Sequence, residues 1–555
     1  MSLGILGSAL SGLSASQRSL ETASNNIANV NTEGYSRQRV ELANLPEQLT
    51  PAGYLGTGVN AVNIARSYDQ FITGQLRSST TAFSELDVYH SLAAHVDNLL
   101  ADQETGLSAS MKNFFNSVND VANDPASIPN RKILLSEVDA LADHFATIGN
   151  RLDDLKQQVN SNLQAGIDEV NKYAQSIAKL NLQIVDAIGR SRGQQMPNEL
   201  MDQRDELLKK IAAKVDVSVV NQSNGAVSVF IGQGQSLVLG AEVSALSLSA
   251  NASDPTHMEI AMNGTEISRQ ISGGEFSGLM RFRDEVLYPA QRQLGTLALG
   301  FATEVNKLHE AGYDLHNTTG NPLFDFGSPA VQVLSRANNV VLSAQFQAPP
   351  TSVANPSEKL GTSYRIDVTA SGLDLTDLSG NNVTASYATL ADLNTAASEL
   401  GFSLTVMSGS FSVGDSFQVS PAINVATTIK RDASIANPQD IAAAQATGLP
   451  GDNRQAMELA KLETATKMQN SKATFNQVYG QLVSDVGGMT STALFGRSAQ
   501  ETLLQEATKT KENLSGVNLD EEAANLIKYQ NSYQAAAQAV SVARSLFDTL
   551  IGAVR

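Results

Sequence analysis

This chain of 555 residues contains three features that could do chemistry: histidines, clustered carboxylates and glycine-rich turns. None of its six histidines has the HExxH spacing or a similar metal-ligand spacing. His90 and His95 stand five positions apart, so they do not share one face of a helix. The chain contains no cysteine, which excludes disulfides, thiolate zinc sites and thiol nucleophiles. We therefore expect neither a metal nor a cofactor.

The other reactive-looking residues also favour a structural interpretation. Asp202, Asp205 and Glu206 lie among basic residues on a predicted helix, which is typical of a solvated, salt-bridged face rather than an acid/base pair. The segment GQGQSLVLG (residues 232–240) lies between predicted strands and opens no helix, so it is a turn and not a phosphate loop. No GxSxG nucleophile motif is present. The sequence predicts that this protein is not an enzyme.

The sequence favours binding to other proteins over catalysis, and a cluster of asparagine side chains is the clearest indication of it. The segment ASNNIANVNTEGYSRQ (residues 23–38) follows a helical apolar pattern, although asparagine is a poor residue for a helix interior. Because amides both donate and accept hydrogen bonds, Asn25, Asn26 and Asn29 could bond neighbouring subunits without burying charge. The alternative is that they only cap and end the helix. Assembly contact is the hypothesis adopted here.

Both ends of the chain carry apolar seams with alternating spacings of three and four, the pattern of a coiled coil. Asn518 is the expected cap of the C-terminal helix. The alternative is that each seam packs into the chain's own core. Since glycines weaken the N-terminal helix, we expect both ends to become ordered on assembly. The predicted assembly or partner-binding residues are Leu6, Leu10, Leu13, Leu20, Asn25, Asn26, Ile27, Asn29, Leu526, Tyr529, Tyr533, Val540, Phe547 and Leu550.

The interior alternates between helical and strand-like patterns. Helices are expected over residues 79–120, 141–188, 196–211, 279–312, 453–484 and 497–513. Hydrophobic alternation with period two predicts β structure from Val215 to about Gly274, and again over 325–430. The expected fold class is α+β multidomain: paired N- and C-terminal helices and a long-helix bundle body, with two inserted mostly-β domains.

The predicted domains follow from that layout. Residues 1–40 and 515–555 are the terminal helices, expected to form an inner coiled-coil layer. The helical body is predicted over 41–212, 275–324 and 431–514. The first β domain is predicted over 213–274 and the second over 325–430.

Composition excludes several partners. The formal net charge of −18 disfavours nucleic acid and anionic membrane surfaces, so we expect neither as a partner. No run of about 18 apolar residues predicts a membrane span. The N-terminus has no basic residue before Arg18 and no massed apolar block, so it does not look like a Sec signal peptide. If the protein leaves the cell, its route needs no such signal.

Two terminal motifs carry a family resemblance. ASNNIANVNTEGYSR near the start and SGVNLDEEAANLIKYQNSYQAAAQ near the end resemble the paired terminal signatures of bacterial flagellar axial proteins. The interior segments NELMDQRDELLKKIA, AVSVFIGQGQSLVLG and LMRFRDEVLYPAQRQLGTLALGFATEVNKLHEAGYDL resemble the hook-associated protein 1 (FlgK) family. The resemblance covers residues 1 to about 325 and about 430 to 555. Relatives often carry proline where Glu33 stands, and Gly34 still allows the turn.

The resemblance implies a structural protein that leaves the cell through the flagellar type III export apparatus without a cleaved signal. It implies a ring of copies at the extracellular hook–filament junction, between the hook protein and a second junction protein. An export chaperone would hold the C-terminal helix before secretion. The alternatives are another axial protein, such as a hook subunit, or a secreted adhesin whose β domains bind surfaces.

Overall fold

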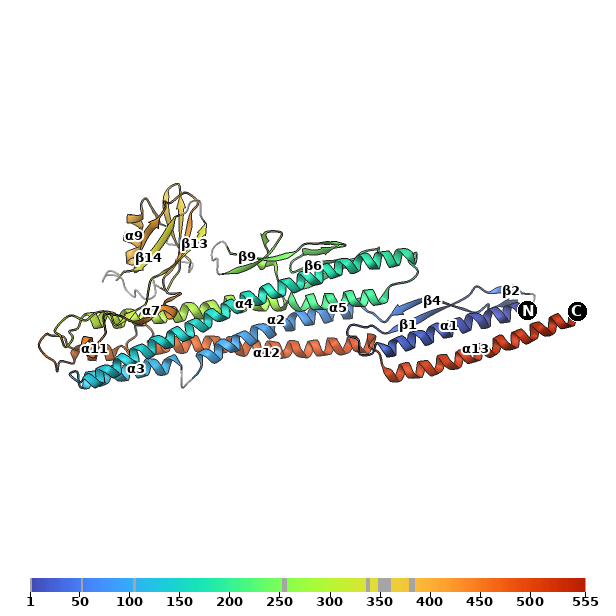
Figure 1. Cartoon of the computed structure of the whole chain (residues 1–555), viewed down its shortest axis with the longest axis horizontal. Coiled ribbons are helices and arrows are strands. Elements are labelled where there is room, and N and C mark those ends of the chain that lie inside the picture. Colours follow the sequence, from blue (N-terminus) through green and yellow to red (C-terminus); the bar gives the residue numbers. More distant parts are fainter. Residues whose placement is uncertain are drawn as a thin grey trace.

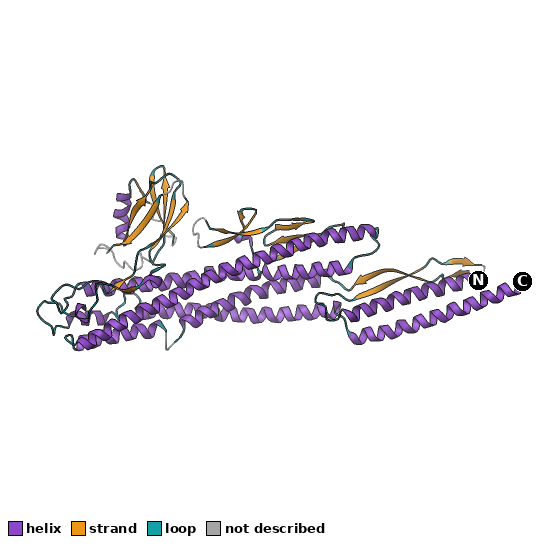
Figure 2. Cartoon of the chain, viewed as in Figure 1, coloured by secondary structure: helices purple, strands orange, loops and turns teal. Residues whose placement is uncertain are grey.

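A long bundle of helices forms the body of the molecule, with β elements on one side and the two termini together at one end (Figure 1). The computed structural model describes residues 2–50, 53–102, 106–251, 257–335, 340–347, 361–378 and 385–554. Figure 2 shows that helices dominate and that the strands lie along the bundle or in a separate lobe. This arrangement confirms the predicted α+β multidomain fold class.

The bundle consists of helices contributed by distant parts of the chain. In chain order they are α2 (Gln70–Leu100), α3 (Leu107–Asn123), α4 (Ile128–Arg190), α5 (Asn198–Lys214), α6 (Gly274–Arg281), α7 (Tyr288–Glu310), α11 (Arg454–Lys461) and α12 (Phe475–Ser515). A π-helical turn, Phe282–Leu287, joins α6 to α7. α2 and α12 run side by side in opposite directions (Figure 1). The Tyr479 hydroxyl of α12 donates to the Leu100 carbonyl, 2.7 Å away, at the end of α2.

The 63-residue helix α4 is the backbone of the bundle. At about 1.5 Å per residue it is roughly 95 Å long. Ser127 caps its start by accepting from the Asn130 N–H. The predicted apolar seam is buried from Leu141 to Ile184 except at Leu155, which packs at the margin of the core. At Gly166 the ring of Phe276 takes the place of a side chain, so α6 lies directly against α4.

The first β region shares the core of the helices. It contains a four-stranded antiparallel sheet in the order β5-β6-β7-β8 and a three-stranded sheet in the order β11-β10-β9. Val229, Ile231 and Leu237 from these strands belong to the same buried cluster as the bundle. The bounds are β5 Val217–Asn221, β6 Val227–Ile231, β7 Gln235–Leu239, β8 Glu242–Val243, β9 Leu246–Ala250, β10 Met258–Met262 and β11 Thr265–Glu266, followed by a 3-10 turn at Ser268–Gln270.

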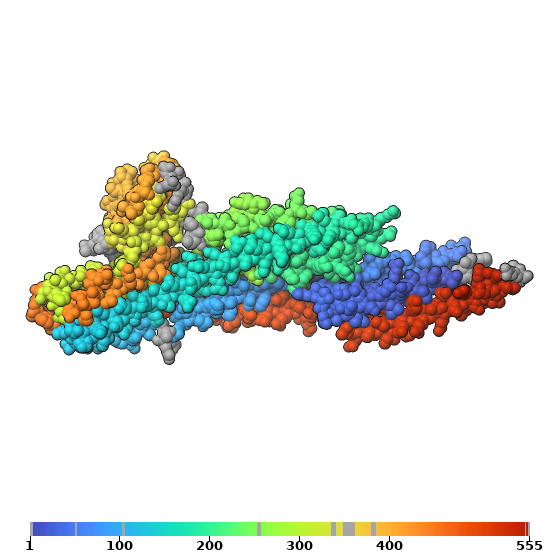
Figure 3. All heavy atoms as spheres, viewed as in Figure 1, coloured from blue at the N-terminus to red at the C-terminus, as the bar shows by residue number. Residues whose placement is uncertain are grey.

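The second β region has a core of its own and stands away from the bundle as a lobe (Figure 3). Its five-stranded sheet has the order β13-β19-β15-β16-β17, and β14 pairs separately with β18. β12 and β20 pair where the chain leaves and re-enters the body. The bounds are β12 Phe324–Asp325, β13 Ala330–Ser335, β14 Val341–Phe346, β15 Tyr364–Thr369, β16 Gly372–Asp377, β17 Ala385–Tyr387, α9 Leu390–Glu399, β18 Phe402–Ser408, β19 Ser416–Ser420, α10 Val425–Thr428 and β20 Lys430–Arg431.

Some predicted helical segments differ in the structure. Residues 38–44 and 59–66, which were grouped mostly with the helical body, are paired antiparallel strands. The helix expected over 79–120 is interrupted between α2 and α3. The helix expected over 453–484 is broken between α11 and α12, where Gln469, Asn470 and Ser471 all have positive φ angles of 53–60°. No helix among the described residues is long and apolar enough to cross a membrane.

Candidate assembly interface

The two ends of the chain form one slender unit. α1 (Ser2–Ala28) and α13 (Leu519–Val554) run side by side beyond the bundle (Figure 1). The hairpin of β1 (Gln38–Asn44) and β4 (Val59–Arg66) packs against α1, and β2 (Gln48–Thr50) pairs with β3 (Gly53–Leu55) towards its tip. The Asn518 side chain accepts from the backbone N–H groups of Asp520 and Glu521, which confirms it as the cap of α13. We call α1 and α13 together the terminal helix pair.

Small residues, rather than leucines, line the buried face of α1. A side chain added at Gly12 would lie 3.9 Å from the Cβ atom of Ala536, so the two helices approach closely there. Leu6 is 36% exposed and Leu10 is 57% exposed. The buried line is thus displaced from the predicted seam, because glycine, alanine and serine let helices come closer than leucine does. The buried residues of α1 are Ala15, Ser19, Thr22, Ala23 and Asn26.

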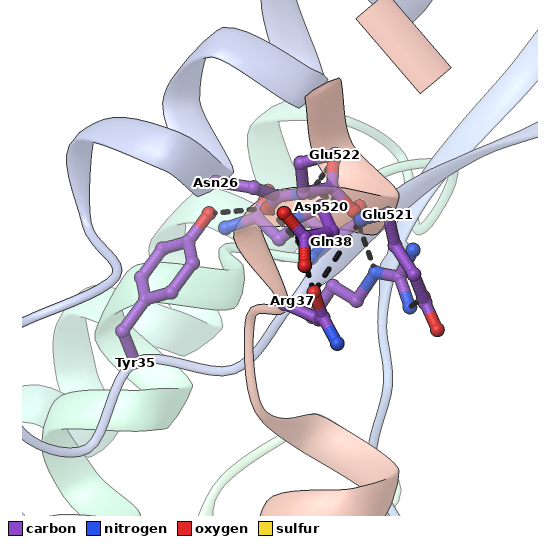
Figure 4. A network of polar contacts seen from close by, with 8 residues as sticks. Asn26, Tyr35, Arg37, Gln38, Asp520, Glu521 and Glu522 are labelled. Carbon is purple, nitrogen blue, oxygen red and sulfur yellow. Dashed lines mark hydrogen bonds and ion pairs between the residues drawn. The ribbon is translucent and has the colours of Figure 1, made fainter. Parts of the chain in front are cut away.

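Asn26 is the centre of a polar cluster at the base of the terminal helix pair (Figure 4). Its side chain is 1% exposed. Its amide nitrogen donates to the Gln38 carbonyl at 2.9 Å and to Glu522 Oε2 at 3.1 Å. Its oxygen accepts from the Gln38 N–H and from the Tyr35 hydroxyl, both at 2.9 Å. One side chain therefore joins the end of α1 to β1 and to the start of α13.

Arg37 fixes the start of α13 from the other side of the cluster. Its Nε donates to Glu522 Oε1 and its NH1 to Glu521 Oε2, each at 2.7 Å. Its backbone N–H donates to the Ser515 carbonyl, at the end of α12. Charge-assisted bonds to two carboxylates are stronger than neutral ones. Arg37 thus sets the angle at which α13 leaves α12.

A second ion cluster ties the segment after α1 and the end of β4 to α5. The Ser36 N–H donates to Asp202 Oδ2 at 2.9 Å, and Arg66 NH1 donates to Asp202 and to Asp205, both at 2.7 Å. Burial raises the pKa of Asp202, and the bonds from Arg66 and Ser36 partly offset that rise. Burial, followed by the nearby acids Asp202, Glu199 and Glu522, raises the pKa of Tyr35 to about 12. Asp202 is buried, so the predicted solvated face was wrong at this residue.

This geometry is that of a structural joint. No group of three or more metal-ligating side chains occurs in the part of the chain that the structure describes. The side-chain nitrogen and oxygen of Asn26 both have their hydrogen-bond partners within the chain. No nucleophile stands beside a base among the described residues of the cluster. The arrangement can hold two helices at a fixed angle to the bundle.

Comparison with known proteins accounts for both the bundle and the terminal helix pair. Residues 93–324 match the model of the flagellar hook-associated protein FlgK helical domain. Residues 6–35 match the flagella basal body rod protein model, and 513–553 match the C-terminal model of basal body rod FlgEFG proteins. The flagellar hook-associated protein 1 of Escherichia coli is 33% identical, with 99% of each chain covered. The chain belongs to the flagellar hook-associated protein 1 family.

Other relatives agree with this assignment to the FlgK family. The hook-associated protein 1 of Salmonella typhimurium is 33% identical over 99% of both chains, and that of Bacillus subtilis is 27% identical over 97% of this chain and 96% of its own. The solved flagellar hook junction protein FlgK from Burkholderia pseudomallei has the same fold, with a TM-score of 0.66 and 24% identity. It covers 80% of this chain and all of its own. The protein is a structural component of the flagellum, at the hook–filament junction.

The predicted FlgK assembly residues fall into three groups. Leu6, Leu10 and Phe547 are exposed. Asn26 is used inside the chain, as are Asn25 and Asn29: the Asn29 amide donates to the Asn25 carbonyl at 3.0 Å and ends the helix. The assembly role of these three amides stays a prediction. Those that are half-buried are Leu13, Leu20, Ile27, Leu526, Tyr529, Tyr533 and Val540, whereas the Leu550 side chain lies outside the described residues.

Sequence reasoning missed the charged members of the joint. Arg37 lies near the end of the asparagine-rich segment, and Glu522 lies in the first turn of α13, where the helix dipole favours an acid without any partner. The available signal was an arginine in a stretch whose one other charge is Glu33, together with acids at the start of the last helix. Neither pattern indicates that the two segments, 485 residues apart, would meet. Gly34, with φ of +81°, lies in the turn between the end of α1 and the start of β1, as expected.

Proposed function

We propose that the protein assembles head-to-tail around the flagellar axis, with the terminal helix pair of each copy contributing to an inner helical layer. The observation that carries this proposal is a set of large apolar side chains exposed on the terminal helix pair. A soluble chain rarely leaves contiguous apolar surface uncovered without a partner. The exposed residues are Ile5, Leu6, Leu10, Leu519, Ile527, Val542, Leu546, Phe547 and Ile551.

The chemistry of these exposed faces suits neighbours of the same kind. α1 has no charged residue before Arg18, so a partner could cover its first half without burying a charge. Full burial of one large apolar side chain contributes roughly 1.5–3 kcal/mol. Half a dozen such residues therefore favour an assembled state strongly. Contacts between different faces of adjacent copies are the heterologous type that builds rings and helical arrays.

The partners follow from this arrangement. Copies of the chain form a ring, the hook protein lies on one side of it and the second junction protein lies on the other. Before assembly, the exposed apolar residues of α13 need a cover, and an export chaperone bound to the C-terminal helix supplies one. The protein reaches the outside of the cell through the flagellar type III export apparatus, and it uses neither nucleic acid nor membrane as a partner.

Immunogold labelling of intact flagella, with antibody raised against the full chain, tests this proposal. We expect a single band at the boundary between hook and filament. Label along the whole curved hook would instead indicate a hook subunit. Label on the cell body would indicate a surface adhesin, and either result would overturn the proposed assembly.

A further inference from the structure

A pocket of about 370 Å³ lies where the helical body, the first β region and the β4–α2 connection meet. Three arginines line it, each from a different element: Arg66 from β4, Arg77 from α2 and Arg204 from α5. Asn221 and Gly225, at the β5–β6 turn, form part of the opposite wall. Such a concentration of guanidinium groups is notable in a chain with a net charge of −18.

Arg66 already has its counter-charges. Its NH1 contacts both Asp202 and Asp205 at 2.7 Å, and its guanidinium carbon lies 4.1 Å from the centre of the Tyr68 ring. Asp205 is the carboxylate that lines the pocket, and it is engaged by this bond. Arg66 therefore holds, by an ion pair, the one acidic side chain among the described residues that line the pocket.

Arg204 is buried and forms no direct ion pair among the described residues, although the nearby Asp205 charge acts to raise its pKa. Only 3% of Arg204 is exposed, and its NH1 donates to Asn181 Oδ1 at 3.1 Å and to the Gly225 carbonyl at 2.8 Å. Its Nε is buried and has no hydrogen-bond partner among the described residues. Burial lowers the pKa of Arg204, which reflects the cost of holding this cation away from water.

Arg77, which is half-buried, also lines the pocket. Its Nε is buried and has no hydrogen-bond partner in the described part of the chain. Within that part, no acidic side chain forms an ion pair with it either. A buried polar group with no partner is costly, and a buried charge more so. Two such donors on one pocket indicate a missing anion.

We propose that this pocket binds a carboxylate group, held by Arg77 and Arg204. The planar fork of an arginine matches a carboxylate, which can accept two parallel N–H bonds. Charge balance favours a monoanion, since Asp202 and Asp205 together neutralise all but one of the three arginines. Bound there, the carboxylate would link α2, α5 and the β5–β6 turn. Its source is either a free small carboxylate or an acidic side chain of a second copy.

Sodium acetate titrated into the full-length protein at constant ionic strength, with chloride as the replaced anion, tests the site. We expect a saturable rise in the thermal unfolding midpoint, because a ligand that binds only the native state stabilises it. In Arg77→Gln the apparent Kd should weaken by about tenfold or more, the loss expected for one charge-assisted hydrogen bond. Arg292→Gln, which removes the same charge from an exposed position of α7, should bind acetate like the wild type.

The absence of a saturable response in the wild type, or equal responses in the Arg77→Gln and Arg292→Gln proteins, would overturn the site. Circular dichroism checks that Arg77→Gln is folded. Sedimentation velocity then distinguishes the two sources of the carboxylate. Self-association that both acetate and Arg77→Gln abolish indicates a carboxylate from a second copy, whereas a monomer that still binds acetate indicates a free one.

Discussion

At the residue scale, one buried amide joins three segments of the chain. Asn26 bonds both backbone groups of Gln38, as a neighbouring strand would, and also holds Glu522. Removing the amide leaves a buried N–H and a buried carboxylate short of partners. Each unsatisfied buried group costs about 1–3 kcal/mol. The asparagine cluster is therefore expected to matter to the single chain before any assembly.

Asn26→Ala should loosen the base of the terminal helix pair. We expect backbone amide exchange at Gln38 and in the first turn of α13 to speed up by tenfold or more, while exchange within α4 stays unchanged, because about 1.4 kcal/mol corresponds to tenfold. Hydrogen exchange with mass spectrometry measures both regions.

Asn25→Ala is the matched control for that experiment. Asn25 is half-buried, its amide nitrogen makes a longer bond of 3.4 Å to the Tyr35 hydroxyl, and its side-chain oxygen accepts from Asn29 Nδ2 at 3.0 Å, so none of these bonds reaches Gln38 or α13. This variant should exchange almost as the wild type does. Equal exchange in the two variants would mean that Asn26 does not hold the joint.

His309 gives the body a pH-dependent contact. It is fully buried, its Nε2 accepts from the Ala442 N–H at 2.8 Å, and its Nδ1 therefore donates to the Asn321 carbonyl at 2.6 Å. Burial lowers its pKa to about 4 from an ordinary 6.5. The unfolded chain binds the proton more readily than the folded chain does. The contribution of neutral His309 to the free energy of unfolding is therefore complete above pH 6.5 and is lost as pH falls towards 4.

Between pH 6.5 and pH 4, protonation of His309 is expected to lower the free energy of unfolding by roughly 3 kcal/mol. Denaturant unfolding of the wild type and His309→Gln at pH 7 and pH 4.5 should show a smaller pH effect in the variant. His95→Gln, at an exposed position of α2, should keep the wild-type dependence. Parallel pH dependence in all three proteins would show that His309 does not titrate in this window.

At the element scale, the packing of α4 against its neighbours depends on where its glycines stand. A methyl group at Gly166 would lie 2.5 Å from the Phe276 ring, whereas one at Gly189 on the same helix would meet nothing within 4 Å. Gly166→Ala should destabilise the body by about 1–3 kcal/mol through overpacking. Gly189→Ala should stabilise it by up to about 1 kcal/mol. Thermal unfolding compares the two, and a stabilising Gly166→Ala would contradict this packing.

Helix patterns could be predicted where large apolar residues carry the packing. The seam from Leu141 to Ile184 follows α4 closely, because most of its buried positions show as a leucine, isoleucine, valine or phenylalanine in the sequence. The terminal helix pair could not be predicted in this way. Its buried face contains Ala15, Ser19 and Ala23, which do not stand out from the exposed small residues around them. The leucines indicated the wrong face for contact within the chain.

The candidate site was predicted in its location but not in its bonding. The asparagine segment and the start of the last helix were both identified from sequence, and the structure brings them together through Asn26, Arg37 and Glu522. Hydrogen bonds between residues this far apart in the chain depend on the tertiary fold. Local pattern shows that a polar residue needs a partner, but it does not show which one.

At the scale of the whole molecule, the chain divides its apolar residues between two tasks. The bundle and both β regions enclose buried apolar cores, while the terminal helix pair leaves many of its large apolar side chains exposed at the far end of a long, narrow body (Figure 3). The joint around Asn26 and Arg37 holds that pair in line with the bundle. A subunit built in this way presents its uncovered surface where neighbouring copies around an axis would meet it.

The most direct test of the account is complementation of a strain that lacks the gene with the double variant Leu10→Gln, Ile527→Gln. Leu10 is 57% exposed and Ile527 is 59% exposed, so the isolated protein should unfold like the wild type. Swimming and filament attachment should be lost, because assembly buries these faces. Val413→Gln, at an exposed apolar position of the second β region, should complement fully. Normal filaments on cells that carry the double variant would contradict the central claim.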